Sequence, residues 1–196
     1  MKNFIKAIIW LVVIALLVYG GFYGYQKIQK TIYPIKYSEI IEKNADEYGL
    51  ERSLVYAVVK CESKFNKNAV SNVGAKGLMQ LTPETYKWVC SKYGDTYNDS
   101  DDLFDPEINV KMGCRLLRLN LKEFRNVKTV LAAYHAGRSR VKEWLNNSDY
   151  SDDQKTLKKI PYSDTSKYVE KVTKTIEKYK EIYNIKWGNF YGLKRA

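Results

Sequence analysis

Apolar residues run without interruption near the start of this chain and recur at helical spacing through the rest of it. Residues 7–26 contain no charged side chain and are dense in Ile, Leu, Val and Trp. About twenty such residues span a bilayer as one helix, at about 1.5 Å per residue. The pattern therefore predicts an N-terminal membrane anchor in residues 1–26, followed by a short stalk in residues 27–37.

A cleaved signal peptide is the alternative interpretation of this segment, because Lys2 and Lys6 precede its apolar run. Bulky aromatic residues occupy the place where a cleavage site would have small side chains: Tyr19, Phe22, Tyr23 and Tyr25. Aromatic residues are typical of the membrane–water interface, which favours a retained anchor. Lysines flank the span on both sides and do not fix its orientation, but a long domain can be translocated regardless of flanking charge.

From residue 38 onward the pattern predicts helices almost throughout. Thr82–Pro83 and Asp105–Pro106 each combine a capping residue with proline at the first helical position. Residues 65–81 lack a helical period and are rich in Asn and Gly, which indicates a loop or a short irregular strand. The expected fold class is all-α, with one compact domain in residues 38–185 and a C-terminal tail in residues 186–196.

The charge of the chain narrows the possible partners without choosing one. The net charge is +11, and +9 remains when Lys2 and Lys6 are set aside. A basic surface suits nucleic acid, anionic lipid or the anionic polymers of a cell wall. No nucleic-acid recognition motif or RNA-binding aromatic pattern appears, so we expect no nucleic-acid partner.

The chain offers little for a metal site. It has one histidine, and its three cysteines show neither CxxC nor zinc spacing: Cys61, Cys90 and Cys114. We therefore expect no metal and no cofactor. At most one disulfide can form within the chain, and a small buried side chain is the more common role of such a cysteine.

Glu62 stands at the C-terminal end of a predicted helix, on the margin of its apolar face. Carbonyl dipoles at a helix C-terminus and partial burial both raise the pKa of a carboxyl group. A partly protonated Glu is what a general acid at a glycosidic bond requires. Most glutamates at helix ends are simply solvated, so the residues that follow must decide.

Three segments in order carry a resemblance to a known family. The first runs from Glu62 to Pro83 and reads ESKFN and then AVSNVGAKGLMQLTP; the second is AAYHAG at 132–137, and the third is IPYSDT at 160–165 with YV at 168–169. These resemble the three signatures of the soluble-lytic-transglycosylase catalytic domain. The resemblance covers about residues 37–183 and implies a lysozyme-like helical fold of the goose type, here with one N-terminal transmembrane helix.

The resemblance implies that Glu62 is the catalytic residue. It would protonate the oxygen between N-acetylmuramic acid and N-acetylglucosamine, then accept the proton of the muramic acid C6 hydroxyl as a 1,6-anhydro ring closes. The sequence adds independent support, since no Asp or Glu lies between Glu62 and Glu84, whereas a hydrolase needs a second carboxylate. A hydrolytic muramidase using a remote carboxylate and a non-catalytic wall tether that binds peptidoglycan remain the alternatives.

The resemblance also implies a set of substrate-binding residues: Ser71, Gln80, Tyr134, His135 and Tyr168. Within this set, Tyr134 is similar to the tyrosine that hydrogen-bonds the catalytic Glu, and Tyr168 to one that flanks the cleft. Ordinary helix packing is the alternative role for both tyrosines. The implied partners are peptidoglycan glycan strands and, through the N-terminal helix, the cytoplasmic membrane, with the catalytic domain outside the cytoplasm.

Two positions depart from the family pattern, and two glycines are expected to shape the backbone of the loop. His135 stands where Asn is usual and adds a titratable group, and Asp164 replaces the usual Glu. Gly74 and Gly77 are expected to turn tightly and to let the backbone approach the glycan.

Overall fold

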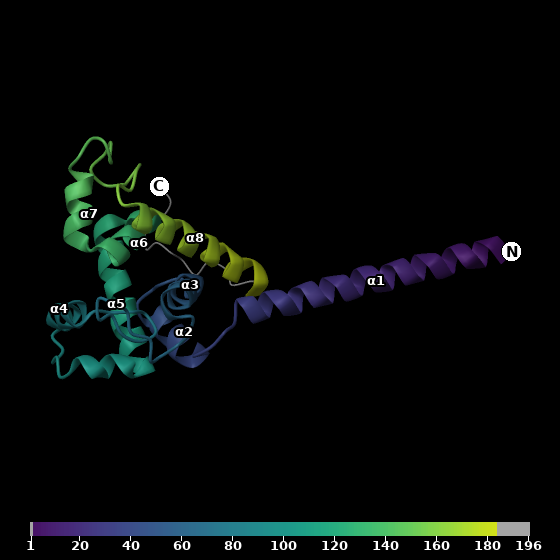
Figure 1. Cartoon of the computed structure of the whole chain (residues 1–196), viewed down its shortest axis with the longest axis horizontal. Helices are drawn as coiled ribbons and strands as arrows, with labels where there is room; N and C mark the ends of the chain where they lie inside the picture. The colour runs from purple at the N-terminus through teal and green to yellow at the C-terminus, as the bar shows by residue number, and fades with distance from the viewer. Residues whose placement is uncertain (1, 184–196) are drawn as a thin grey trace. The chain divides into compact units, whose positions relative to one another are not determined.

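A computed structural model of the chain describes residues 2–183, and the chain divides into two units after Ile35. The first unit is a single uninterrupted helix, α1 (Lys2–Ile32), shown in Figure 1. Its described apolar side chains are exposed, and Phe4–Ile32 is long and apolar enough to cross a membrane. The helix continues through part of the expected stalk and ends just before Pro34, since proline disfavours helical geometry in the preceding residue.

The second unit confirms the all-α prediction over the residues that the structure describes. Its elements are α2 (Ser38–Glu47), α3 (Arg52–Ser63), α4 (Pro83–Tyr93), the 3₁₀ turn η1 (Ser100–Phe104), α5 (Pro106–Phe124), α6 (Val127–Ala136), α7 (Arg138–Leu145) and α8 (Ser163–Tyr183). The expected tail, residues 186–196, lies outside the described residues.

Helix α3 lies at the centre of this unit, because it is buried along most of its length. Helix α8 packs on both α3 and α6, while α6 also packs on α5 and α7. The stacked rings of Tyr56 in α3 and Tyr179 in α8, with centroids 5.5 Å apart, lie fully buried in the first of these contacts. The packing of α8 therefore fixes α3 against a helix that is distant in sequence.

The two predicted proline-led helix starts are confirmed by their caps. Thr82 Oγ1 accepts a hydrogen bond from the backbone N–H of Thr85 at 3.2 Å. Asp105 Oδ1 accepts from the N–H groups of Glu107 and Ile108 at 2.8 and 3.1 Å. These bonds satisfy N–H groups that have no partner within the helix, so α4 and α5 begin where the sequence predicts.

The loop between α3 and α4 is held from below by Asn109 of α5, a residue that is fully buried. Its Oδ1 accepts from Met79 N at 2.7 Å, and its Nδ2 donates to the carbonyls of Lys76 and Leu103 at 2.9 Å each. Gly77 (φ +77°) lies so close to the backbone of Leu103 that an added Cβ would sit 2.1 Å from Leu103 O. The expectation that Gly77 lets the backbone approach a glycan is therefore wrong, because this glycine is buried against the protein.

The three cysteines are free thiols. Cys90 and Cys114 are buried as small core side chains, as the sequence predicts, whereas Cys61 is half-buried. The Sγ of Cys61 lies 3.6 Å from Thr175 Oγ1, so this thiol belongs to the contact between α3 and α8.

Candidate active site

Glu62 is the penultimate residue of α3, and its half-buried side chain faces a cleft. Burial raises the pKa of this carboxyl group to about 7, against the opposing effects of a hydrogen bond from Tyr168 and the charge of Lys171. The group is therefore divided between its acid and its carboxylate near neutral pH. A group in this condition can both give and take a proton in one catalytic cycle.

Tyr168 of α8 orients Glu62, since its hydroxyl donates a hydrogen bond to Glu62 Oε1 at 2.6 Å. The hydroxyl of Tyr134 in α6 instead donates to the carbonyl of Met79 at 2.7 Å. The two tyrosines thus exchange the roles expected from sequence, because α8 rather than α6 brings its hydroxyl to the end of α3. Tyr134 still lines the cleft beside Glu62 while it supports the loop.

His135 also lines the cleft, next to Tyr168. Its ring stacks on that of Tyr168, with centroids 4.4 Å apart, and its Nδ1 lies 3.1 Å from Thr165 Oγ1. Desolvation of the ring by the surrounding protein lowers the pKa of His135, while the negative charge of Asp164 raises it. The net lowering keeps the imidazole neutral at pH 7, as an uncharged replacement for the family's usual Asn.

Ser71 and Gln80 both line the cleft, and both also hold its loop in shape. Ser71 Oγ accepts from the backbone N–H of Ala75 at 3.0 Å. Gln80 Nε2 donates to the carbonyls of Ala69 and Gly77 at 3.0 Å each. The Ser71 hydroxyl proton and the Gln80 carbonyl oxygen remain available to a ligand.

The cleft encloses about 420 Å³, and Glu62 is the one carboxylate among its described lining residues. A second hollow of about 540 Å³ shares four lining residues with it: Thr85, Leu116, Tyr134 and Gly137. A third, of about 570 Å³, shares His135 and Ala136 and includes Asp164. Three adjoining hollows with Glu62 in the shared one suit an extended ligand better than a small one.

Two residues contribute to the site without a clear signal in the sequence. Asn109 fixes the loop, yet in the sequence it is one more polar residue of an amphipathic helix. Lys171 donates to the carbonyl of Cys61 at 3.3 Å and acts on Glu62 through its charge. Within residues 2–183, no group of three or more His, Cys, Asp or Glu side chains is placed to hold a metal ion.

The family is decided by residues 39–157, which match the family model described as the Transglycosylase SLT domain. The chain belongs to this family. Over 143 residues it is 32% identical to the Soluble lytic murein transglycosylase of Escherichia coli (strain K12), a match that covers 71% of this chain and 22% of that protein. It is 30% identical to Membrane-bound lytic murein transglycosylase C of Pectobacterium atrosepticum, covering 74% and 47%.

Solved structures of this family share the fold. The 70-kDa soluble lytic transglycosylase of Escherichia coli matches with a TM-score of 0.71 and 27% identity, over 84% of this chain and 28% of that one. An inactive Glu-to-Gln mutant of lytic transglycosylase Slt from Pseudomonas aeruginosa matches with a TM-score of 0.69 and 29% identity, over 79% and 25%. This chain spans less than half the length of each of these relatives.

Replacing Tyr168 by Phe tests its effect on Glu62. The hydrogen bond from Tyr168 stabilises the carboxylate and lowers the pKa of Glu62, so its loss should raise that pKa further. The alkaline limb of the pH profile of kcat/KM should therefore move to higher pH, while kcat falls about tenfold through loss of orientation. Activity measured from pH 5 to pH 9 checks both effects.

Tyr134→Phe is the matched control, since it removes a hydroxyl that donates to Met79 O and not to Glu62. It should lower the melting temperature and leave the alkaline limb in place. An equal shift in both variants would contradict the assignment of the orienting role to Tyr168.

Proposed function

We propose that this chain is a lytic transglycosylase that cleaves peptidoglycan glycan strands without consuming water. The bond cleaved is the one between N-acetylmuramic acid and N-acetylglucosamine, and the product carries a 1,6-anhydro-muramic acid end. One observation carries the proposal: Glu62, with its raised pKa, is the one carboxylate among the described residues of the cleft. A hydrolase would need a second carboxylate across the sugar from the first.

The proposed reaction uses Glu62 twice. Its protonated form gives a proton to the glycosidic oxygen as the bond from that oxygen to the anomeric carbon breaks. The resulting carboxylate then accepts the proton of the C6 hydroxyl, whose oxygen bonds to the anomeric carbon. The proton count on Glu62 is unchanged at the end, and the hydrogen bond from Tyr168 holds the carboxyl group in place throughout.

Among the described lining residues of the cleft, no second carboxylate is present to stabilise the positive charge that develops on the sugar. In the proposed reaction, the acetamido group of the substrate itself supplies the electron-rich oxygen that stabilises this charge. The cleft residues Ser71 and Gln80 are proposed to bind polar groups of the glycan, together with Tyr134, His135 and Tyr168.

The similarity to proteins of known family supports this proposal. They include soluble and membrane-bound lytic murein transglycosylases, and replacement of a single Glu by Gln accompanies inactivity in the solved Pseudomonas aeruginosa relative. Mass spectrometry of digested sacculi tests the proposal and separates it from its alternatives. A muramidase would leave reducing ends, and a wall tether would release nothing.

We further propose that α1 crosses the cytoplasmic membrane once and leaves the catalytic domain outside the cytoplasm. The support is the length and composition of Phe4–Ile32 and the presence of a membrane-bound relative. The full-length protein should therefore remain with membranes after carbonate extraction and keep its N-terminus. In spheroplasts, external protease should digest the domain. A soluble secreted form beginning near Tyr25 would instead identify a cleaved signal peptide.

A further inference from the structure

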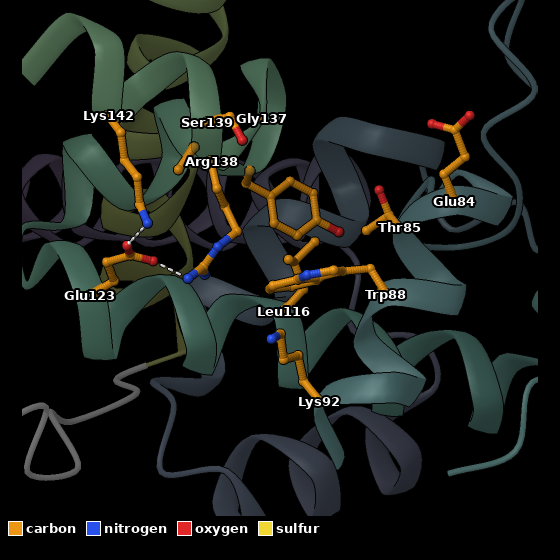
Figure 2. Close-up of a pocket in the computed structure, with 12 residues that line it drawn as sticks. Glu84, Thr85, Trp88, Lys92, Leu116, Glu123, Gly137, Arg138, Ser139 and Lys142 are labelled. Carbon is orange, nitrogen blue, oxygen red and sulfur yellow. Dashed lines mark hydrogen bonds and ion pairs between the residues drawn. The ribbon is translucent and has the colours of Figure 1, made fainter. Parts of the chain in front are cut away.

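The hollow of about 540 Å³ beside the cleft, here called the α4–α7 pocket, is lined by more charged side chains than the cleft itself. Helices α4 and α7 supply most of its lining residues, as Figure 2 shows. Its volume lies within the range of sites for small ligands. Because it shares Tyr134 and Gly137 with the cleft, the pocket adjoins the site of Glu62.

One wall of the α4–α7 pocket is a row of three side chains on α4. Glu84, Trp88 and Lys92 are spaced four residues apart, so they lie on the same face of the helix (Figure 2). The ammonium of Lys92 lies 5.8 Å from the centroid of the Trp88 ring. The row therefore runs from an acid, across an indole, to a base.

The charged side chains in the rest of the pocket form ion pairs with one another. Arg138 and Lys142 of α7 both form ion pairs with Glu123 of α5, as the dashed lines in Figure 2 show. The Arg138 guanidinium also lies 4.9 Å from the centroid of the Trp88 ring. These contacts stiffen the wall that faces the α4 row.

Glu84 and Lys92 differ from that group, because both are exposed and neither forms an ion pair with any described residue. Eight residues of helix separate them by about 12 Å. An acid and a base at the two ends of an indole complement a ligand that carries both an amino group and a carboxylate. A neutral sugar ring would use neither charge.

We propose that the α4–α7 pocket binds the peptide branch that muramic acid carries, with Lys92 binding a carboxylate and Glu84 a free amino group. Such a peptide ends in a carboxylate and, where it is not cross-linked, displays the amine of a diamino acid. Its aliphatic parts would contact Trp88. This inference rests on the proposed function, because it places a sugar of the glycan strand beside Glu62.

The test compares soluble glycan strands that carry peptides with the same strands after an amidase has removed them. Lys92→Ala and Glu84→Gln should each lower kcat/KM about 5- to 10-fold on peptide-bearing strands and leave it unchanged on stripped strands. Lys87→Ala, on the same helix, and Glu143→Gln, on α7, are matched controls, since both residues are exposed and lie outside the pocket. Neither control should change the ratio between the two substrates.

Acetylating the free amino groups of the peptide-bearing strands separates the two charges. Acetylation should abolish the effect of Glu84→Gln and preserve that of Lys92→Ala. Equal losses on both substrates, or a Glu84→Gln effect that survives acetylation, would overturn the pocket assignment alone. Absence of anhydro products from the wild-type protein on either substrate would overturn the proposed function, and the inference with it.

Discussion

Replacing Glu62 by Gln should lower turnover of purified peptidoglycan by ~10²-fold or more. Gln keeps the shape of the side chain and can still accept the hydrogen bond from Tyr168, but it has no proton to give to the glycosidic oxygen. Release of soluble muropeptides from sacculi measures the effect. Turnover like that of the wild-type protein would remove Glu62 from the reaction.

We expect the same variant to be more stable than the wild-type protein at alkaline pH. This result would also show that the variant is folded. Below pH 4.5 the Glu62 carboxyl is protonated in both the folded and the unfolded chain, so the variant gains nothing. Between pH 4.5 and about 7 only the unfolded chain releases the proton, so the free energy of unfolding of the wild type falls. Above pH 7 the loss reaches on the order of 3 kcal/mol, which Gln avoids.

Melting temperatures at pH 4.5 and pH 8 measure this difference. If the melting temperature of Glu62→Gln exceeds that of the wild type only at the higher pH, the variant is folded and has lost a buried charge. Its loss of activity then comes from the missing carboxyl group. A variant that is less stable at both values would show instead that its inactivity comes from damage to the fold.

The products of the wild-type protein should be muropeptides that end in 1,6-anhydro-muramic acid. A hydroxyl already bound beside the anomeric carbon has a high effective concentration, so it can outcompete water without a dedicated base. These products are one water lighter than those of a muramidase and lack a reducing end. Mass spectra before and after borohydride reduction distinguish the two, because reduction changes only reducing ends.

Asp164→Asn is the control for a hidden second carboxylate. Asp164 lines the neighbouring hollow with His135 and does not line the cleft with Glu62. The substitution should therefore leave the anhydro products unchanged in kind. Reducing ends as the main product of the wild-type chain would contradict the transglycosylase proposal, and Asp164 would then be the first candidate for the missing base.

The helices, the caps and the position of Glu62 could all be predicted from local features of the sequence. Thr82–Pro83 and Asp105–Pro106 contain both a cap and a residue already restrained to helical φ, so these helix starts depend on few distant contacts. Glu62 could be singled out because helix periodicity puts it beside a buried face, and the raised pKa follows from that burial. The three family signatures supplied the rest of the candidate site.

Contacts between helices could not be predicted in the same way. Helix periodicity fixes the face on which a tyrosine lies, but not which neighbour its hydroxyl reaches. Tyr168 and Glu62 are 106 residues apart, and only the packing of α8 on α3 brings them to 2.6 Å. The prediction for Gly77 failed for the same reason, since its close approach to Leu103 depends on the position of α5 beneath the loop.

The sequence by itself determined that this protein has an apolar N-terminal helix, an all-α domain and one acid at the end of a helix that contributes to a cleft. Each of these depends on residues close together in the chain, where propensity and periodicity act. Only the tertiary structure decided that Tyr168 orients the acid and that Glu84 and Lys92 border a pocket adjoining its cleft. Those relations depend on the packing of whole helices, because side chains from distant segments meet only when the buried faces of those helices come together.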